Sequence, residues 1–309
     1  MSYHLQQAVV VTSIMQKKLE GTFVVTVTPF DESDRVNVGE LRNLVDYFIE
    51  NGVDGIFVGG STGEFAYLTQ DELMKIIETV VTHANKRVPV LAGTAACATK
   101  QSVALSKYAE SVGADGVVVV PPFYHRPTEE GILHHYRSIS DAISIPLMVY
   151  NNPSTAKVDM SPDLIARLSE FSNVRYVKES SGDITRIWKI RNLTSDRMTV
   201  FCGGDNMALE SFLMGATGFI CVASNFLPRE TSEIYRLYKN GRIEEARKVY
   251  EKILPVLNFL EDTGKFVQIS KAALNLKGKT VGQARSPLMP LNPAEEKRLK
   301  DLLSQLEEM

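Results

Sequence analysis

The chain has 309 residues, of which 44% are hydrophobic and 23% are charged, and its formal net charge is -3 at pH 7. This composition is typical of a globular protein that forms one large domain or two medium ones. The weak negative charge excludes a field that attracts nucleic acid or an anionic membrane, and no apolar run is long enough to cross a bilayer. The three cysteines are far apart and form no C-x-x-C pair, so we expect reduced thiols and a cytoplasmic location.

Residues 1–18 are expected to be an N-terminal extension ahead of the folded chain. The apolar run 8–11 precedes Lys17 and Lys18. A secretion signal has its positive charges before its apolar region, so this order argues against one.

Eight short runs rich in β-branched residues recur along the chain and predict eight strands. They are apolar almost throughout, as expected for parallel strands that are covered on both faces. The predicted strands are Thr22–Thr28, Gly55–Gly59, Val88–Gly93, Gly116–Val120, Pro146–Tyr150, Val174–Lys178, Thr199–Cys202 and Gly218–Val222.

Amphipathic helical patterns separate these runs and carry start and stop signals. Thr69 and Glu72 have the spacing of a capping box, and Ser161 followed by Pro162 predicts another helix start. Glycines are placed where three of the helices should stop, at Gly52, Gly113 and Gly241.

Eight strands that alternate with helices predict a (β/α)₈ TIM barrel over residues 19–240. A doubly wound open sheet is the alternative, but no G-x-G-x-x-G motif follows the first strand. Residues 241–309 contain no further strand pattern and predict a C-terminal extension of three helices, at Arg242–Leu260, Lys265–Leu276 and Pro293–Glu308.

Lys178 is the only basic residue among the last positions of the predicted strands. An ammonium that leaves water without a partner is costly, and an amine that loses its proton there is a nucleophile that forms Schiff bases with ketones. The alternative is a structural lysine whose head group reaches water at the strand end. Because catalytic groups of barrels stand at the carboxyl ends of the strands, this position favours the nucleophile.

Two other strand ends suit the same chemistry. Tyr150 shares strand parity with Met148, so its phenol should point into the barrel and could transfer protons. The segment Gly59–Glu64 combines glycines with the hydroxyls of Ser61 and Thr62 and could bind a carboxylate. No residues have metal-ligand spacing, and the pair His134–His135 is expected at the surface.

Several motifs, in combination and in order, resemble the dihydrodipicolinate synthase and N-acetylneuraminate lyase family of class I aldolases. The resemblance covers the chain from Gly21 to its end. It rests on Gly60-Ser61-Thr62-Gly63-Glu64, Tyr150-Asn151-x-Pro153, Val177-Lys178-Glu179-Ser180-Ser181-Gly182, Ala272-Ala273-Leu274-Asn275-Leu276 and Arg285-Ser286-Pro287-Leu288.

The resemblance implies a (β/α)₈ barrel, usually a homotetramer, that needs no metal or organic cofactor. The lysine that matches Lys178 forms a Schiff base with pyruvate or another 2-oxo acid, and the phenol that matches Tyr150 transfers protons. The carboxylate of the 2-oxo acid is bound by the residues that match Ser61 and Thr62.

Three further positions follow from the resemblance alone. Tyr124 matches the tyrosine that reaches across a subunit interface and completes a proton relay through Ser61. Gly203 and Ile220 match positions that line the pocket.

Thr155 departs from the family pattern, because dihydrodipicolinate synthases usually place there an arginine that binds the carboxylate of aspartate semialdehyde. A threonine cannot replace a bidentate, permanently charged clamp. We therefore expect a Schiff-base lyase that cleaves or forms a 2-keto-3-deoxy sugar acid or a similar compound, with Asp205 and Asn206 as candidates to bind hydroxyls. The alternatives are a 4-hydroxy-tetrahydrodipicolinate synthase, a Schiff-base dehydratase or deaminase, and a non-catalytic 2-oxo acid sensor.

Overall fold

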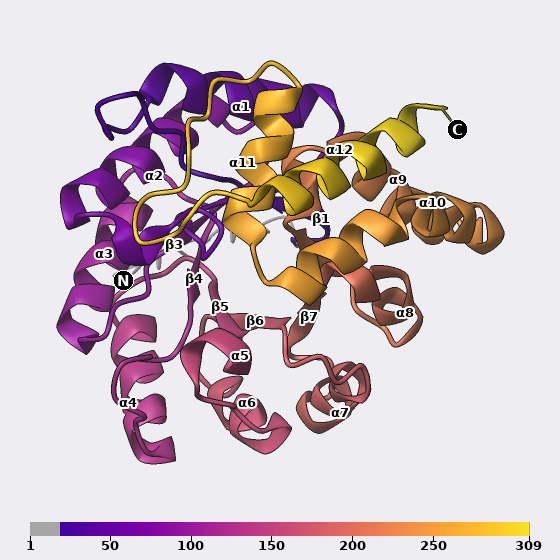
Figure 1. Cartoon of the computed structure of the whole chain (residues 1–309). Coiled ribbons are helices and arrows are strands. Elements are labelled where there is room, and N and C mark those ends of the chain that lie inside the picture. The colour runs from indigo at the N-terminus through magenta and orange to yellow at the C-terminus, as the bar shows by residue number, and fades with distance from the viewer. Residues whose placement is uncertain (1–18, 309) are drawn as a thin grey trace, which may run out of the picture.

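The computed structural model describes residues 19–308, so the predicted extension at residues 1–18 lies outside the described part. Within that part, parallel strands close a barrel in chain order, which confirms the predicted (β/α)₈ fold (Figure 1). The strands are β1 (Gly21–Val25), β2 (Gly55–Val58), β3 (Val90–Gly93), β4 (Gly116–Val119), β5 (Leu147–Asn151), β6 (Val174–Glu179), β7 (Thr199–Cys202) and β8 (Gly218–Cys221).

Helices surround the barrel between successive strands (Figure 1). They are α1 (Val38–Glu50), α2 (Gln70–Ala84), α3 (Thr99–Ser111), α4 (Glu129–Ser140), α5 (Pro153–Ala156), α6 (Pro162–Leu168), α7 (Thr185–Thr194), α8 (Ala208–Leu213) and α9 (Pro228–Lys239). Three short 3₁₀ turns, at the carboxyl side of β2, β7 and β8, are η1 (Phe65–Tyr67), η2 (Asp205–Met207) and η3 (Ala223–Asn225).

The helix signals of the sequence are found in the structure. The Thr69 hydroxyl accepts the N–H of Glu72 and the Glu72 carboxylate accepts the N–H of Thr69, which together form the predicted capping box at α2. The Ser161 hydroxyl caps α6 through a single bond, which it accepts from the N–H of Leu164. His135, expected at the surface, is instead buried, and its Nδ1 lies 3.0 Å from the hydroxyl of Thr99 on the neighbouring helix α3.

Large rings fill space beside glycines on the neighbouring strands of the barrel. A Cβ at Gly55 would lie 2.1 Å from the ring of Phe23, and one at Gly218 would lie 2.1 Å from the ring of Phe201. These two phenylalanines meet edge to face at 5.5 Å between ring centroids. The barrel is therefore a packed core rather than a channel, and it supports rigid strand ends.

The C-terminal helices are α10 (Ile243–Thr263), α11 (Phe266–Leu276) and α12 (Pro293–Glu308). α10 packs on α9 and on η2, and α11 packs on η3. Since η2 and η3 follow strands β7 and β8, these helices cover part of the carboxyl end of the barrel (Figure 1). In residues 19–308 no helix has both the length and the apolar content that a membrane span requires.

Gly93 at the end of β3 tests how closely neighbouring strand ends are packed. A Cβ there would lie 2.0 Å from the carbonyl oxygen of Gly59, and backbone cannot move aside as a side chain can. We expect Gly93→Ala to lower the free energy of unfolding by about 1–3 kcal/mol, measured by urea denaturation. In Gly39→Ala the nearest atom is 3.5 Å away, so this variant should match or exceed the native stability; equal stability of both variants would contradict the packing argument.

Candidate active site

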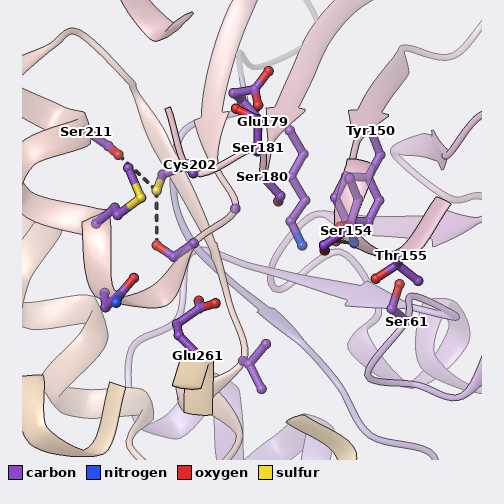
Figure 2. Close-up of a pocket in the computed structure, with 18 of the residues that line it drawn as sticks. Ser61, Tyr150, Ser154, Thr155, Glu179, Ser180, Ser181, Cys202, Ser211 and Glu261 are labelled. Carbon is purple, nitrogen blue, oxygen red and sulfur yellow. Dashed lines mark hydrogen bonds between the residues drawn. The ribbon is translucent and has the colours of Figure 1, made fainter. Parts of the chain in front are cut away.

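A cavity of about 300 Å³ opens at the carboxyl ends of the strands (Figure 2). Its wall includes the predicted residues Lys178, Tyr150, Ser61, Thr62 and Gly203. They lie at or just after the ends of β2, β5, β6 and β7. The parallel barrel brings these strand ends together at one face, although they are far apart in the sequence.

Lys178 is nearly the last residue of β6 and is only 3% exposed. Its Nζ lies 4.3 Å from the ring centroid of Tyr150 and 5.9 Å from that of Phe57. Among residues 19–308 no carboxylate lies within ion-pair distance of this Nζ. An amine that is buried against rings, without a salt bridge, is suited to nucleophilic addition rather than to a structural ion pair.

Tyr150 faces Lys178 because β5 and β6 are in register, with these two residues directly paired. Its phenol oxygen accepts a hydrogen bond from Nδ2 of Asn152 at 3.0 Å. Oδ1 of the same Asn152 side chain accepts a hydrogen bond from the Ser154 hydroxyl at 2.8 Å. With one lone pair engaged in this way, the phenolic O–H is left to donate to a bound ligand.

The loop Gly59–Glu64 presents Ser61 and Thr62 to the cavity. Its glycines allow close packing, because a Cβ at Gly63 would lie 3.0 Å from the carbonyl oxygen of Thr26. The Gly63 carbonyl also accepts the Thr28 hydroxyl at 2.6 Å, which ties the loop to the segment after β1. The two hydroxyls are therefore held in a defined place, as binding of a small carboxylate requires.

Glu64, which ends this loop, connects it to the C-terminal extension. Its Oε1 lies 2.6 Å from Nζ of Lys271 on α11, and both side chains are almost fully buried, at 0% and 1% exposure. Its Oε2 accepts the N–H of Arg285 at 2.7 Å. The Arg285 guanidinium continues the contact with a bidentate pair to Glu72 on α2.

Gly203 follows β7 and has no room for a side chain. A Cβ there would lie 1.8 Å from Oγ of Ser180 and 2.8 Å from Cε of Lys178. Any larger residue would therefore displace the amine from its position. Burial raises the pKa of the neighbouring Cys202 to about 12, so its thiol stays protonated and is not a competing nucleophile.

Two predicted site residues are not brought to the cavity within this chain. Tyr124 is 79% exposed and stacks edge to face on His125, and it is absent from the cavity wall. Ile220 is fully buried on β8, where it pairs with Phe23 of β1. Their roles stay predictions that rest on the family resemblance.

Asp205 is also not available to a substrate. It is fully buried, and its carboxylate accepts the N–H groups of Val222 and Ala223 at 3.0 and 2.7 Å. Burial raises the pKa of Asp205, while these N–H bonds oppose the shift. Its function is to hold the end of β7 against the end of β8.

Sequence reasoning missed Glu261, which lines the cavity from α10. It also gave no role to Asn152, Ser154 and Ser180, which lie beside the recognised motifs and line the cavity too. These three residues could have been predicted, because each lies next to a recognised motif in the sequence. No sequence signal indicates Glu261, because only the packing of α10 on η2 brings it to the strand ends.

Comparison with known proteins identifies the same relatives over the whole described chain. The profile of the dihydrodipicolinate synthetase family matches residues 18–306. The chain is 39% identical to 4-hydroxy-tetrahydrodipicolinate synthase 1 of Halalkalibacterium halodurans, covering 89% of this chain and 92% of that protein. It is 37% identical to the 4-hydroxy-tetrahydrodipicolinate synthase of Geobacter metallireducens, and this match covers 93% of this chain and 99% of that protein.

Solved structures give the same result. A putative dihydrodipicolinate synthetase from Pseudomonas aeruginosa is 35% identical, with a TM-score of 0.91 over 94% of this chain and 100% of that one. The dihydrodipicolinate synthase of Acinetobacter baumannii, solved with pyruvate, is 33% identical. Its TM-score is 0.89, and the match covers 94% of this chain and 100% of that one.

These relatives correct the expected substrate. A lyase of 2-keto-3-deoxy sugar acids was expected because Thr155 stands where the family usually has arginine, but relatives at 35–39% identity are named as synthases instead. The comparisons therefore favour the synthase alternative. The expectation failed because it gave one side chain, which contacts one end of one substrate, more weight than agreement along the whole chain.

The buried pair of Lys271 and Glu64 generates a stability prediction. Lys271→Met leaves a buried carboxylate without its cation, which should lower the free energy of unfolding by about 3–5 kcal/mol. Urea denaturation measures the loss, and the Michaelis constant for the 2-oxo acid should rise because the Ser61 loop loses its anchor. Lys297→Met, which removes an 82% exposed side chain from its pair with Asp301, should change stability by less than about 0.5 kcal/mol.

The double variant Lys271→Met with Glu64→Gln separates the pair from its surroundings. Removing both charges should recover part of the stability lost in the single variant. A double variant no more stable than Lys271→Met would mean that the carboxylate does not depend on this lysine.

Proposed function

This chain belongs to the dihydrodipicolinate synthetase family, and we propose that it catalyses the reaction of a 4-hydroxy-tetrahydrodipicolinate synthase, with Lys178 as the Schiff-base lysine. Enzymes of this family are lyases that form a lysine Schiff base with pyruvate. The observation that carries the proposal is the position of Lys178. It is 3% exposed, faces the Tyr150 ring at 4.3 Å, and lies in a cavity at the carboxyl end of the barrel.

The first half of the reaction follows from these neighbours. Nζ of Lys178 adds to the ketone carbon of pyruvate, and the resulting carbinolamine loses water to give the imine. The leaving hydroxyl needs a proton, and the Tyr150 phenol, whose ring lies 4.3 Å from Nζ, is the proposed acid. The phenolate of Tyr150 then takes a proton from the methyl group, which gives an enamine. The enamine carbon adds to the aldehyde carbon of the second substrate, and the aldehyde oxygen receives a proton from the Tyr150 phenol.

Ser61 and Thr62 are the proposed binding site for the pyruvate carboxylate. They supply neutral hydroxyl donors from a loop that is fixed by Glu64 and Gly63. Such a site binds an anion without placing another cation beside the amine. The ketone carbon is then directed toward Lys178 across the cavity.

The second substrate that we propose is aspartate semialdehyde, since the named product contains a ring nitrogen and a second carboxylate that pyruvate does not supply. Ser154 and Thr155 line the cavity and can donate hydroxyl hydrogen bonds to that carboxylate. Single neutral bonds are weaker than a bidentate arginine pair. We therefore propose a second substrate that depends on further contacts for its affinity.

We also propose a homotetramer in which Tyr124 enters the site of a neighbouring subunit and completes the relay through Ser61. The 79% exposure of this large aromatic residue supports an interface at its loop. The unpaired cysteines support a cytoplasmic location.

Trapping with borohydride tests the central step. The native protein incubated with pyruvate and borohydride should gain the mass of one reduced adduct per chain, and peptide mapping should place it at Lys178. Lys178→Met should give no adduct, because the nucleophile is absent. Lys157→Met, which removes an exposed lysine near the site, should react as the native protein does; an adduct on any other lysine would overturn the assignment.

Tyr150→Phe tests the proton transfer. Removal of a positioned acid and base should lower kcat by about 10²–10⁴-fold, while the Michaelis constant for pyruvate changes little. The measurement is steady-state condensation with aspartate semialdehyde, together with the rate of adduct formation under borohydride. A kcat within about threefold of native would exclude Tyr150 as the principal proton carrier.

A further inference from the structure

Glu261 forms part of the cavity wall that none of the steps above uses. It lies in the last turn of α10, is half-buried, and lines the cavity together with Gly204, Asn206 and Phe266. Its Oε1 accepts the N–H of Asp205 at 2.8 Å. Figure 2 shows Glu261 entering the cavity from a different side than Tyr150 and Thr155.

The structural contact of Glu261 with the Asp205 N–H uses only one oxygen of its carboxylate. The last turn of a helix carries the partial negative charge of the macrodipole, so an acidic side chain there is unfavourable. Burial and the nearby Asp205 raise the pKa of Glu261 to about 7, whereas Lys178 acts in the opposite direction and Asp262 adds to the rise. The protein itself therefore stabilises this anion poorly, and a cationic ligand would stabilise it.

The other charges of the cavity wall are already engaged. Glu179 pairs with Arg186 and accepts the N–H of Ser181, and Asp183 bonds Thr185 at the exposed rim. Among the described residues 19–308, Lys178 is the only basic side chain in the wall. Within residues 19–308, Oε2 of Glu261 has no hydrogen-bond partner, so this oxygen is open to a ligand.

We propose that Glu261 binds the ammonium group of the aldehyde substrate and makes the site specific for an amino-aldehyde. This inference rests on the proposed function and adds the contact that its second substrate needs. The aldehyde carbon faces the imine at Lys178, the carboxylate lies at Ser154 and Thr155, and the ammonium lies at Glu261. Three such points select one orientation and compensate for the missing arginine clamp.

The test compares two aldehydes that differ in the amino group alone. The Michaelis constant for aspartate semialdehyde and the inhibition constant of succinic semialdehyde are measured for the native protein and for Glu261→Gln. Glutamine keeps an oxygen that can accept the Asp205 N–H but has no charge. The Michaelis constant should rise about 10–100-fold through loss of one charge-assisted bond, and the inhibition constant should change less than about threefold.

Asp262→Asn is the matched control, because it removes the same charge from the next, exposed residue of α10. Asp262 has only the smallest effect on the pKa of Glu261 and is not part of the cavity wall, so both constants should change less than about threefold. If Glu261→Gln weakens the binding of both aldehydes equally, or weakens the binding of neither, the assignment of the ammonium site is overturned. The pyruvate adduct should form at the native rate in this variant.

The two proposals fail in different ways. If the native protein forms the adduct at Lys178 but never consumes aspartate semialdehyde, the proposed synthase function is wrong, and the ammonium site is overturned with it. If the native protein is active and Glu261→Gln keeps a native Michaelis constant, only the assignment of Glu261 is wrong.

Discussion

The buried pair between Lys271 and Glu64 is the interaction on which the arrangement of the site depends. Both charges are out of water at a distance of 2.6 Å, so neither side can be removed without leaving an isolated buried charge. One partner ends the loop that presents Ser61 and Thr62, and the other belongs to α11. The C-terminal helices are consequently part of the active site rather than an appendage to a complete barrel.

Much of the fold and the centre of the site could be predicted from sequence, because both depend on local patterns. Apolar β-branched runs that alternate with capped helices are periodic signals, and they identify the barrel. In a barrel the strand ends converge, so Lys178 and Tyr150 could be placed together from their positions alone, and the register of β5 and β6 pairs them.

The rest could not be predicted because it depends on contacts between distant segments. Glu261 has an ordinary position in a polar helix, and only the way α10 lies on η2 brings it to Lys178. Asp205 could not be recognised as structural without the backbone of Val222 and Ala223 around it. The substrate prediction from Thr155 was wrong for a related reason, because the effect of a missing arginine depends on groups elsewhere in the cavity.

The contact between Glu64 and Arg285 also orders events during synthesis. The two residues are 221 positions apart, so the ribosome completes most of the chain before the partners of the Glu64 carboxylate emerge. Lys178 on β6 is synthesised long before Lys271 and Arg285, the residues that contact Glu64. The loop of Ser61 and Thr62 can therefore reach its final contacts with the C-terminal segment only after Arg285 has been synthesised.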